Sequence, residues 1–172
     1  MINRMWACTV KFTCCWLSLF LIGCSPEYNW RETQAAQSRI VIAFPSRVQT
    51  ESREIVIEGQ KSLFTMAVAS VGPAVFAVGD VSIPEGLSVA QTNALTQSFV
   101  ESLANNYGQK APERTEPDNW FRLEAQIAGQ PSVMWAKVFV HRGVLVQIVV
   151  SGPKSKLPQE QAMQFMHSLV LK

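Results

Sequence analysis

The residue whose chemistry the sequence specifies most closely is Cys24, at the end of an apolar run near the N-terminus. The segment before it begins with basic and no acidic residues, continues with a predominantly apolar run over residues 12–22, and places Gly23 before the cysteine. A basic start, an apolar middle and a small residue before the cut are typical of a secretory signal peptide. A membrane-spanning helix needs about 20 apolar residues, roughly twice the length of this run. We therefore predict a cleaved signal peptide over residues 1–23.

Leu21, Ile22, Gly23 and Cys24 together resemble the lipobox of bacterial lipoproteins. In that family the cysteine thiol is joined to diacylglycerol, the peptide is cut before the cysteine, and the new N-terminus is acylated with a fatty acid such as palmitate. The resemblance implies signal cleavage between Gly23 and Cys24 and lipid attachment at Cys24. Several acyl chains anchor a protein stably, whereas one chain binds marginally. Ser25, in place of an aspartate, implies sorting to the outer membrane in enteric-type bacteria, with the domain facing the periplasm.

The signal peptide accounts for the excess of positive charge and for most of the cysteines. The chain has 15 basic and 13 acidic residues, and Arg4 and Lys11 lie in the segment that would be removed, which leaves 13 of each sign. The processed chain therefore offers no general positive charge to nucleic acid. The same segment contains Cys8, Cys14 and Cys15. With Cys24 lipidated, the domain has no thiol for a disulfide or a metal site.

Alternating or apolar runs predict the strands that follow a short tether over residues 24–27. They cover residues 28–31, 38–44, 47–57, 62–70, 74–81, 120–127, 132–141 and 144–151. Tyr28 and Trp30 are expected to pack on the core; the alternative is contact with lipid headgroups.

Two helices complete the predicted fold. Ser88 and Gln91 fit a capping box at the start of a long amphipathic helix over residues 88–107. Pro158 suits the first turn of a final helix. Runs of strands followed by helices predict an α+β fold, in which an antiparallel sheet of about seven to eight strands, in two β-meanders, packs with two main helices. After the signal helix, residues 28–172 are expected to form a single domain.

The hairpin of the second meander carries the best candidate binding surface. With Gly129 and Gln130 as a two-residue loop, one face of this hairpin is apolar throughout and is predicted to be core. On the opposite face, the same register places Glu124 opposite Trp135, Arg122 opposite Lys137, and Trp120 opposite Phe139.

That second face combines ring surface with positive charge. The candidate residues for contact with a ligand or partner are Trp120, Arg122, Trp135, Lys137 and Phe139. Because aromatic side chains mainly supply buried area, we favour the interpretation that a helix, in the first place the long one, covers these aromatics. The alternative is that they form an exposed binding surface.

The sequence lacks the common catalytic and metal-binding motifs. His141 and His167 are the two histidines, and neither H-x-x-x-H nor H-E-x-x-H occurs. G-x-S-x-G, Walker and dinucleotide-binding motifs are also missing. We therefore predict no metal site, no cofactor and no catalytic residue, and we expect that the protein is not an enzyme.

Two short segments and the order of elements carry a further resemblance. The opening Tyr28-Asn29-Trp30-Arg31-Glu32 and the strand Phe76-Ala77-Val78-Gly79 resemble small proteobacterial lipoproteins of unknown function. More remotely, the plan is similar to PsbP-like domains, in which an antiparallel sheet packs with helices. The resemblance covers most of residues 28–171 and implies an accessory or assembly role at a membrane complex. It places no family metal site on these residues.

Three functional hypotheses follow. The first is a membrane-anchored, periplasm-facing lipoprotein with a non-enzymatic binding or assembly-accessory role in the cell envelope, whose partner is an envelope protein. The second is a carrier of a small apolar ligand or lipid on the aromatic face, and the third is an enzyme that uses unrecognised carboxylates. A flat exposed aromatic patch would favour the first, and a cavity against the sheet would favour the second. A cleft with several buried, strongly shifted carboxylates would favour the third.

Overall fold

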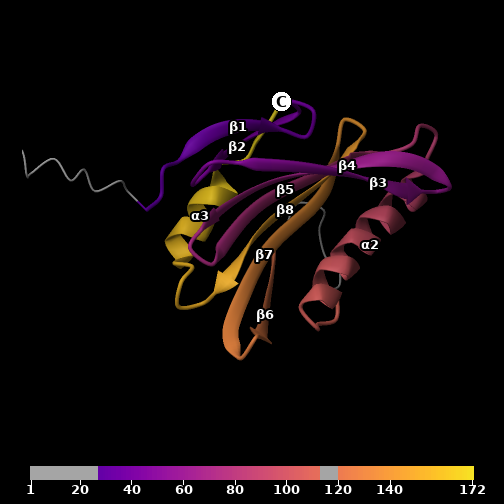
Figure 1. Ribbon diagram of the computed structural model, residues 1–172. Helices are drawn as coiled ribbons and strands as arrows, with labels where there is room; N and C mark the ends of the chain where they lie inside the picture. The colour runs from indigo at the N-terminus through magenta and orange to yellow at the C-terminus, as the bar shows by residue number, and fades with distance from the viewer. Residues whose placement is uncertain (1–26, 113–119) are drawn as a thin grey trace, which may run out of the picture.

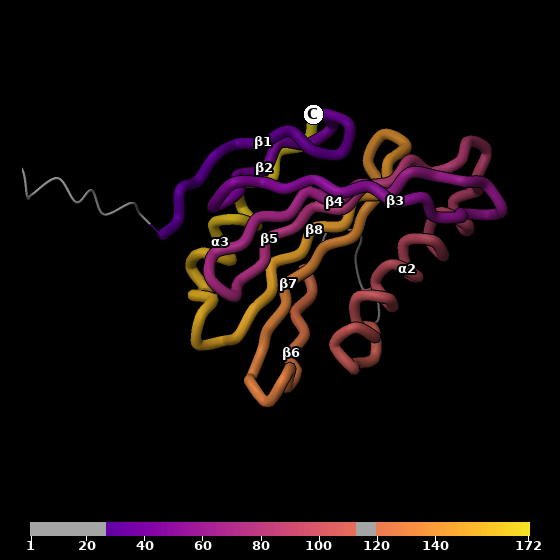
Figure 2. The backbone as a smooth tube through the Cα atoms, viewed as in Figure 1, coloured from indigo at the N-terminus to yellow at the C-terminus, as the bar shows by residue number. Residues whose placement is uncertain are grey.

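The computed structural model describes residues 27–112 and 120–172, and a six-stranded antiparallel sheet lies at their centre. In space the strands follow the order β3 (Gln49–Ile57), β4 (Gln60–Val71), β5 (Ala74–Ser82), β8 (Val144–Pro153), β7 (Gln130–His141) and β6 (Phe121–Ile127). Two meanders, β3-β4-β5 and β6-β7-β8, therefore meet at the β5–β8 pair (Figures 1 and 2). The α+β fold with two meanders that the sequence predicts is confirmed.

A smaller sheet and two helices pack on this main sheet. The small sheet contains β1 (Arg31–Ala35), β2 (Ile40–Phe44) and β9 (Val170–Leu171), in the order β1-β2-β9. The long helix α2 (Val89–Asn106) follows the first meander, and α3 (Gln159–His167) follows the second. Figure 1 shows α3 close to the small sheet and α2 apart from both. The described strands thus form two sheets, where the sequence predicted one.

Each face of the main sheet has its own hydrophobic core, because strand side chains alternate between the faces. On one face, which we call the α3 face, Phe76 of β5 packs with Phe165 of α3 at 5.3 Å between ring centroids, and Phe165 packs with Phe44 of β2 at 5.5 Å. On the other face, which we call the α2 face, Leu103 of α2 packs with a cluster that includes Met134 of β7. The central strands are consequently buried on both sides.

Two-residue turns with glycine in second place close the hairpins. The turns Glu58-Gly59, Ala128-Gly129 and Arg142-Gly143 have positive φ at both positions, as type I′ turns require. The loops predicted at Gly59-Gln60 and Gly129-Gln130 are therefore wrong by one residue. Glycine takes the second turn position, which has the larger positive φ, 77° and 78° in these two hairpins.

The pairing of β6 with β7 changes accordingly. Arg122 lies opposite Trp135 instead of Lys137, and Glu124 lies opposite Val133 instead of Trp135. The predicted register is offset by two residues, which is one full side-chain period of a strand. For this reason the predicted division of the hairpin into two faces is unaffected.

The predicted long helix is confirmed, including its cap. The Ser88 hydroxyl accepts a hydrogen bond from the Gln91 N–H at 3.2 Å, and the Gln91 side chain accepts one from the Ser88 N–H at 3.0 Å. This reciprocal pair satisfies donors that the first helical turn would leave free. After the helix, Gly108 adopts a φ of 63°, which lets the chain turn away.

The first described residues are packed, although they precede β1. Tyr28 and Trp30 stack with ring centroids 6.0 Å apart, and their edges meet Phe76 at 6.4 and 6.0 Å respectively. The expectation that they pack on the core is confirmed, whereas the predicted first strand begins only at Arg31. β9 was not predicted, because two residues are too few to show a strand pattern.

The loop between β1 and β2 is a left-handed turn without glycine. Ala36, Gln37 and Ser38 have φ values of 50°, 55° and 65°, a conformation that costs roughly 1–2 kcal/mol per residue. The buried carboxylate of Asp80 on β5 accepts a hydrogen bond from the Ala36 N–H. Gln37 Nε2 donates to Ser82 Oγ at 2.7 Å. These bonds hold the strained turn against the main sheet.

Substitutions of Asp80 test this bond. Burial raises the pKa of Asp80 above its ordinary value of 3.8, while the Ala36 N–H and Arg39 oppose the shift. A carboxyl with a raised folded-state pKa loses its contribution to stability as the pH rises through that pKa. We expect Asp80→Asn, which keeps an acceptor, to be at least as stable as the native chain at neutral pH. The difference in the free energy of unfolding between the two chains should vanish below pH 3.8.

The matched variant Asp80→Ala removes the acceptor. It leaves the buried Ala36 N–H unpaired and is expected to lower the free energy of unfolding by about 1–3 kcal/mol. Urea unfolding of both variants over a range of pH measures the two effects. Equal losses for Asn and Ala would show that the turn needs the negative charge and contradict this account.

Candidate functional site

The structure brings all five residues of the predicted surface to one side of the main sheet. Arg122 lies on β6, Trp135, Lys137 and Phe139 lie on β7, and Trp120 precedes β6. Their side chains share the α3 face, where the aromatic members pack against its core. Phe139 is 6% exposed, Trp120, Trp135 and Lys137 are half-buried, and Arg122 is exposed. We call this set the aromatic face.

The long helix does not cover the aromatic face, contrary to the interpretation that the sequence favoured. α2 packs on the opposite side of the sheet, against a cluster that includes Leu123, Met134, Ala136 and Val138. The apolar side of the hairpin is therefore the side that α2 buries, as the sequence predicted. The aromatic face shares its core with α3 and the small sheet instead.

Cationic side chains of the chain itself lie over the rings of the aromatic face. The guanidinium carbon of Arg122 is 5.4 Å from the centre of the Trp135 ring, its direct cross-strand neighbour. Lys137 Nζ is 5.3 Å from the centre of the Phe139 ring. Such contacts contribute about 0.5–1 kcal/mol at exposed sites. They give the surface alternating ring and cationic areas in a fixed arrangement.

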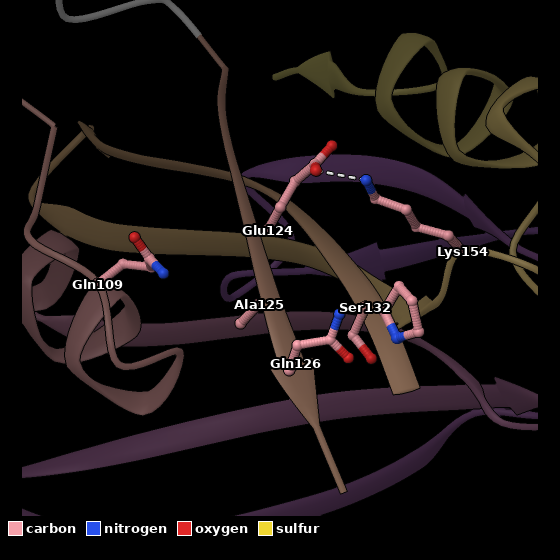
Figure 3. Close-up of a pocket in the computed structure, with 7 residues that line it drawn as sticks. Gln109, Glu124, Ala125, Gln126, Ser132 and Lys154 are labelled. Atoms are coloured by element: carbon pink, nitrogen blue, oxygen red, sulfur yellow. Dashed lines mark hydrogen bonds and ion pairs between the residues drawn. The ribbon is translucent and has the colours of Figure 1, made fainter. Parts of the chain in front are cut away.

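Glu124 connects this face to the segment that follows β8. Its carboxylate forms ion pairs with Arg122 and with Lys154, and the Lys154 pair is visible in Figure 3. The hydrogen bond from Lys154 comes first among the causes that hold the pKa of Glu124 below its ordinary value, followed by the charges of Arg122 and Lys154. The Lys154 N–H also donates to the carbonyl of Pro131 at 2.9 Å, which fixes Lys154 beside β7.

An open, polar hollow of about 350 Å³ lies at β6 (Figure 3). Residues from the segment after α2, from the β6–β7 hairpin and from the segment after β8 line it: Gln109, Glu124, Ala125, Gln126, Pro131, Ser132 and Lys154. Five of the seven lining residues have an amide, hydroxyl or charged side chain, so the hollow can accept polar backbone or side-chain groups of a partner.

The described residues do not assemble a metal-binding cluster of His, Cys, Asp or Glu side chains. In residues 27–112 and 120–172, no three His, Cys, Asp or Glu side chains are placed to hold a metal ion. His141 donates a hydrogen bond from Nε2 to the backbone oxygen of Lys172, 2.8 Å away, and His167 ends α3. In the same residues Asp80 is the one buried carboxylate, and it serves the left-handed turn.

Lys154 is the member of the site that the sequence did not single out. It lies 30 residues after Glu124, beyond β7 and β8. Nothing in the local pattern around Gly152 and Pro153 indicates that the following lysine returns to β6. Only the three-dimensional pairing of β6, β7 and β8 brings the two charges together.

The predicted lipid attachment site, Cys24, and the cleavage position after Gly23 lie outside the described residues. Within the part of the chain that the structure describes, neither helix has the length and apolar character needed to cross a membrane.

Comparisons with known proteins give one distant match. No protein-family model matches the chain, and no curated protein matches it. Among solved structures, the chain is similar to cyanobacterial PsbP (CyanoP) from Synechocystis sp. PCC 6803, at 11% sequence identity and a TM-score of 0.46. The match covers 87% of this chain and 96% of that chain.

The ion pairs of Glu124 give a titration that can be measured. We expect the side-chain carboxyl of Glu124 to titrate below its ordinary pKa of 4.5, because ionised Glu124 accepts a hydrogen bond from Lys154 and lies beside Arg122. Lys154→Met should raise this pKa more than Arg122→Met does, since the Lys154 bond is the larger cause. Lys156→Met serves as the control. An unchanged NMR titration midpoint in Lys154→Met would show that the pair does not form in solution.

Proposed function

We propose that the protein is a lipid-anchored, non-enzymatic accessory protein of the cell envelope that binds an envelope protein through its aromatic face. The observation that carries the anchoring is the position of Gly23-Cys24 directly behind an apolar run half as long as a membrane span. The proposed location is the outer membrane, with the domain facing the periplasm. A domain held at a membrane in this way meets its partners at the bilayer surface.

The packing of the first described residues supports a position close to the bilayer. The rings of Tyr28 and Trp30 lie against Phe76, and the Asn29 N–H donates to the Pro45 carbonyl at 2.7 Å. The folded domain therefore begins four residues after Cys24. Four extended residues span about 10–15 Å. A lipid on Cys24 would hold the domain within this distance of the headgroups.

The form of the aromatic face favours a protein partner over a small apolar ligand. A carrier would need an enclosed apolar cavity against the sheet. Here Phe139 is buried, Arg122 lies over Trp135, and the adjoining hollow is open and polar. Half-buried aromatic side chains with an adjacent arginine are typical of the centre of a protein interface. Carriage of a small apolar ligand or lipid remains the second candidate function.

The anchor has its own test at Cys24. We expect Cys24→Ala to abolish incorporation of labelled fatty acid and to leave the precursor uncut, because both steps require the thiol. Metabolic labelling followed by mass spectrometry of the purified chain measures both. Cys14→Ala, which alters the apolar run but not the modified residue, is the control. Continued acylation of Cys24→Ala at another cysteine would contradict the assignment.

The aromatic face is tested by crosslinking in living cells. A photoreactive residue at Gln126, which is exposed beside the face, should capture one envelope protein, and the same residue at exposed Lys61 of the far hairpin should not. We expect Trp120→Ala to reduce the capture at least about tenfold, the effect of losing one interface aromatic worth 1.4 kcal/mol or more.

Trp120→Phe, which keeps a ring, should retain most of the capture. Thermal unfolding of both Trp120 variants separates a lost interface from a lost fold. If Trp120→Ala captures the same protein as well as the native chain does, the aromatic face is not the interface. Capture that is equal at Gln126 and Lys61 would also contradict the proposal.

A further inference from the structure

β6 is an edge of the main sheet, and half of its backbone groups point away from it. The type I′ turn makes Ile127 and Gln130 a hydrogen-bonded pair, so alternate residues of β6 bond to β7 from there on. The N–H and C=O groups of Arg122, Glu124 and Gln126 consequently point outward. No other residue in the described part of the chain pairs with these six groups. Such an edge is a template for one more strand.

The surroundings of this edge differ from those of β3, the opposite edge. Three segments form the walls of the hollow at β6: the segment after α2, the β6–β7 hairpin and the segment after β8. Gln109, which follows α2, lies on one side, and Lys154 lies on the other (Figure 3). The hollow at the β3 edge is lined by β3 and β4 alone. A strand added to β6 would therefore meet side walls as well as backbone groups, and a strand added to β3 would not.

The charges along β6 indicate the kind of strand that fits. Glu124 is shared by two cations, and the side chains of Arg122, Glu124 and Lys154 remain 50%, 41% and 42% exposed. Among the residues that the structure describes, one carboxylate for two cations leaves a surplus positive charge at this edge. In an added strand every second side chain would fall on this side of the sheet. A carboxylate there would satisfy the second cation and replace part of its lost hydration.

We propose that β6 accepts an extended acidic segment of a partner protein as an added strand of the main sheet. This inference rests on the proposed binding function and specifies its mode. Backbone hydrogen bonds to Arg122, Glu124 and Gln126 supply the affinity, and the surplus positive charge beside Glu124 selects acidic side chains. The aromatic face then packs on residues of the partner next to that segment.

Two synthetic peptides of nine residues test the mode, with alternating Thr-Glu and alternating Thr-Lys sequences. Both are titrated calorimetrically into the full-length chain in detergent. We expect the Thr-Glu peptide to bind and the Thr-Lys peptide to bind at least about tenfold more weakly. Hydrogen exchange should show new protection at the amides of Arg122, Glu124 and Gln126 on saturation with the Thr-Glu peptide. The amides of Leu123 and Ala125, already bonded to β7, should change little.

A matched pair of proline variants separates edge pairing from surface charge. Gln126→Pro removes one outward N–H from β6 and should raise the dissociation constant about tenfold, as the loss of one or two backbone hydrogen bonds predicts. Ser52→Pro removes the equivalent outward N–H from β3 and should have no effect. Proline at an outward edge position is compatible with a strand, so both variants are expected to fold. Circular dichroism checks this.

The possible outcomes separate this inference from the proposed function. If neither peptide binds, if both bind equally, or if Gln126→Pro and Ser52→Pro behave alike, the acidic added strand is overturned. Capture at Gln126 in cells together with any of these results leaves the proposed function standing. Absence of capture in cells overturns the proposed function even if the Thr-Glu peptide binds. Dimers of the chain that Gln126→Pro dissociates would assign the edge to a second copy and overturn the partner segment.

Discussion

The pairing of β5 with β8 is the constraint on which the rest of the structure depends. It joins the two meanders through pairs that run from Val75–Ser151 to Ser82–Val144. Layers pack on both sides of these strands, so most side chains there are buried. The packing is tight: a Cβ on Gly79 would lie 2.6 Å from the Phe64 ring. Apart from Asp80, which serves the left-handed turn, the described centre is packed with apolar side chains, and the candidate site lies at the sheet edge.

Local signals in the sequence predicted much of this fold, and the missing parts are non-local. Ser88 with Gln91 set the start of α2, and glycine turns set the hairpins to within one residue. The faces of β6 and β7 were correct because an error of two residues preserves side-chain parity. By contrast, the small sheet depends on β9, and the candidate site depends on Lys154 meeting Glu124 across 30 residues. The partners of such contacts lie too far apart in the sequence for any local pattern to include both of them.

The two faces of the β6–β7 hairpin are covered to different extents, and this leaves part of the aromatic face accessible. α2 buries the apolar side of the β6–β7 hairpin, so this edge strand is held firmly from one side. On the other side, the core of α3 and the small sheet contains Phe139 and reaches only the partly buried Trp120 and Trp135. Beyond them, Arg122 and Glu124 are exposed. A rigid edge with one covered side is suited to recognition, because little conformational entropy is lost when a partner binds.

The small sheet determines the order in which the molecule can assemble. The Ala43 N–H donates to Ser168 Oγ, 125 residues further along the chain, at 2.9 Å. Contacts over such separations form later than hairpins, because the long intervening loop must close first. We therefore expect the two meanders to form before β2 pairs with β9. The α3 face should stay uncovered until that pairing is made. The strained turn at Ala36 takes its bonds from Asp80 and Ser82 of β5, so it reaches its final conformation only once the first meander has formed.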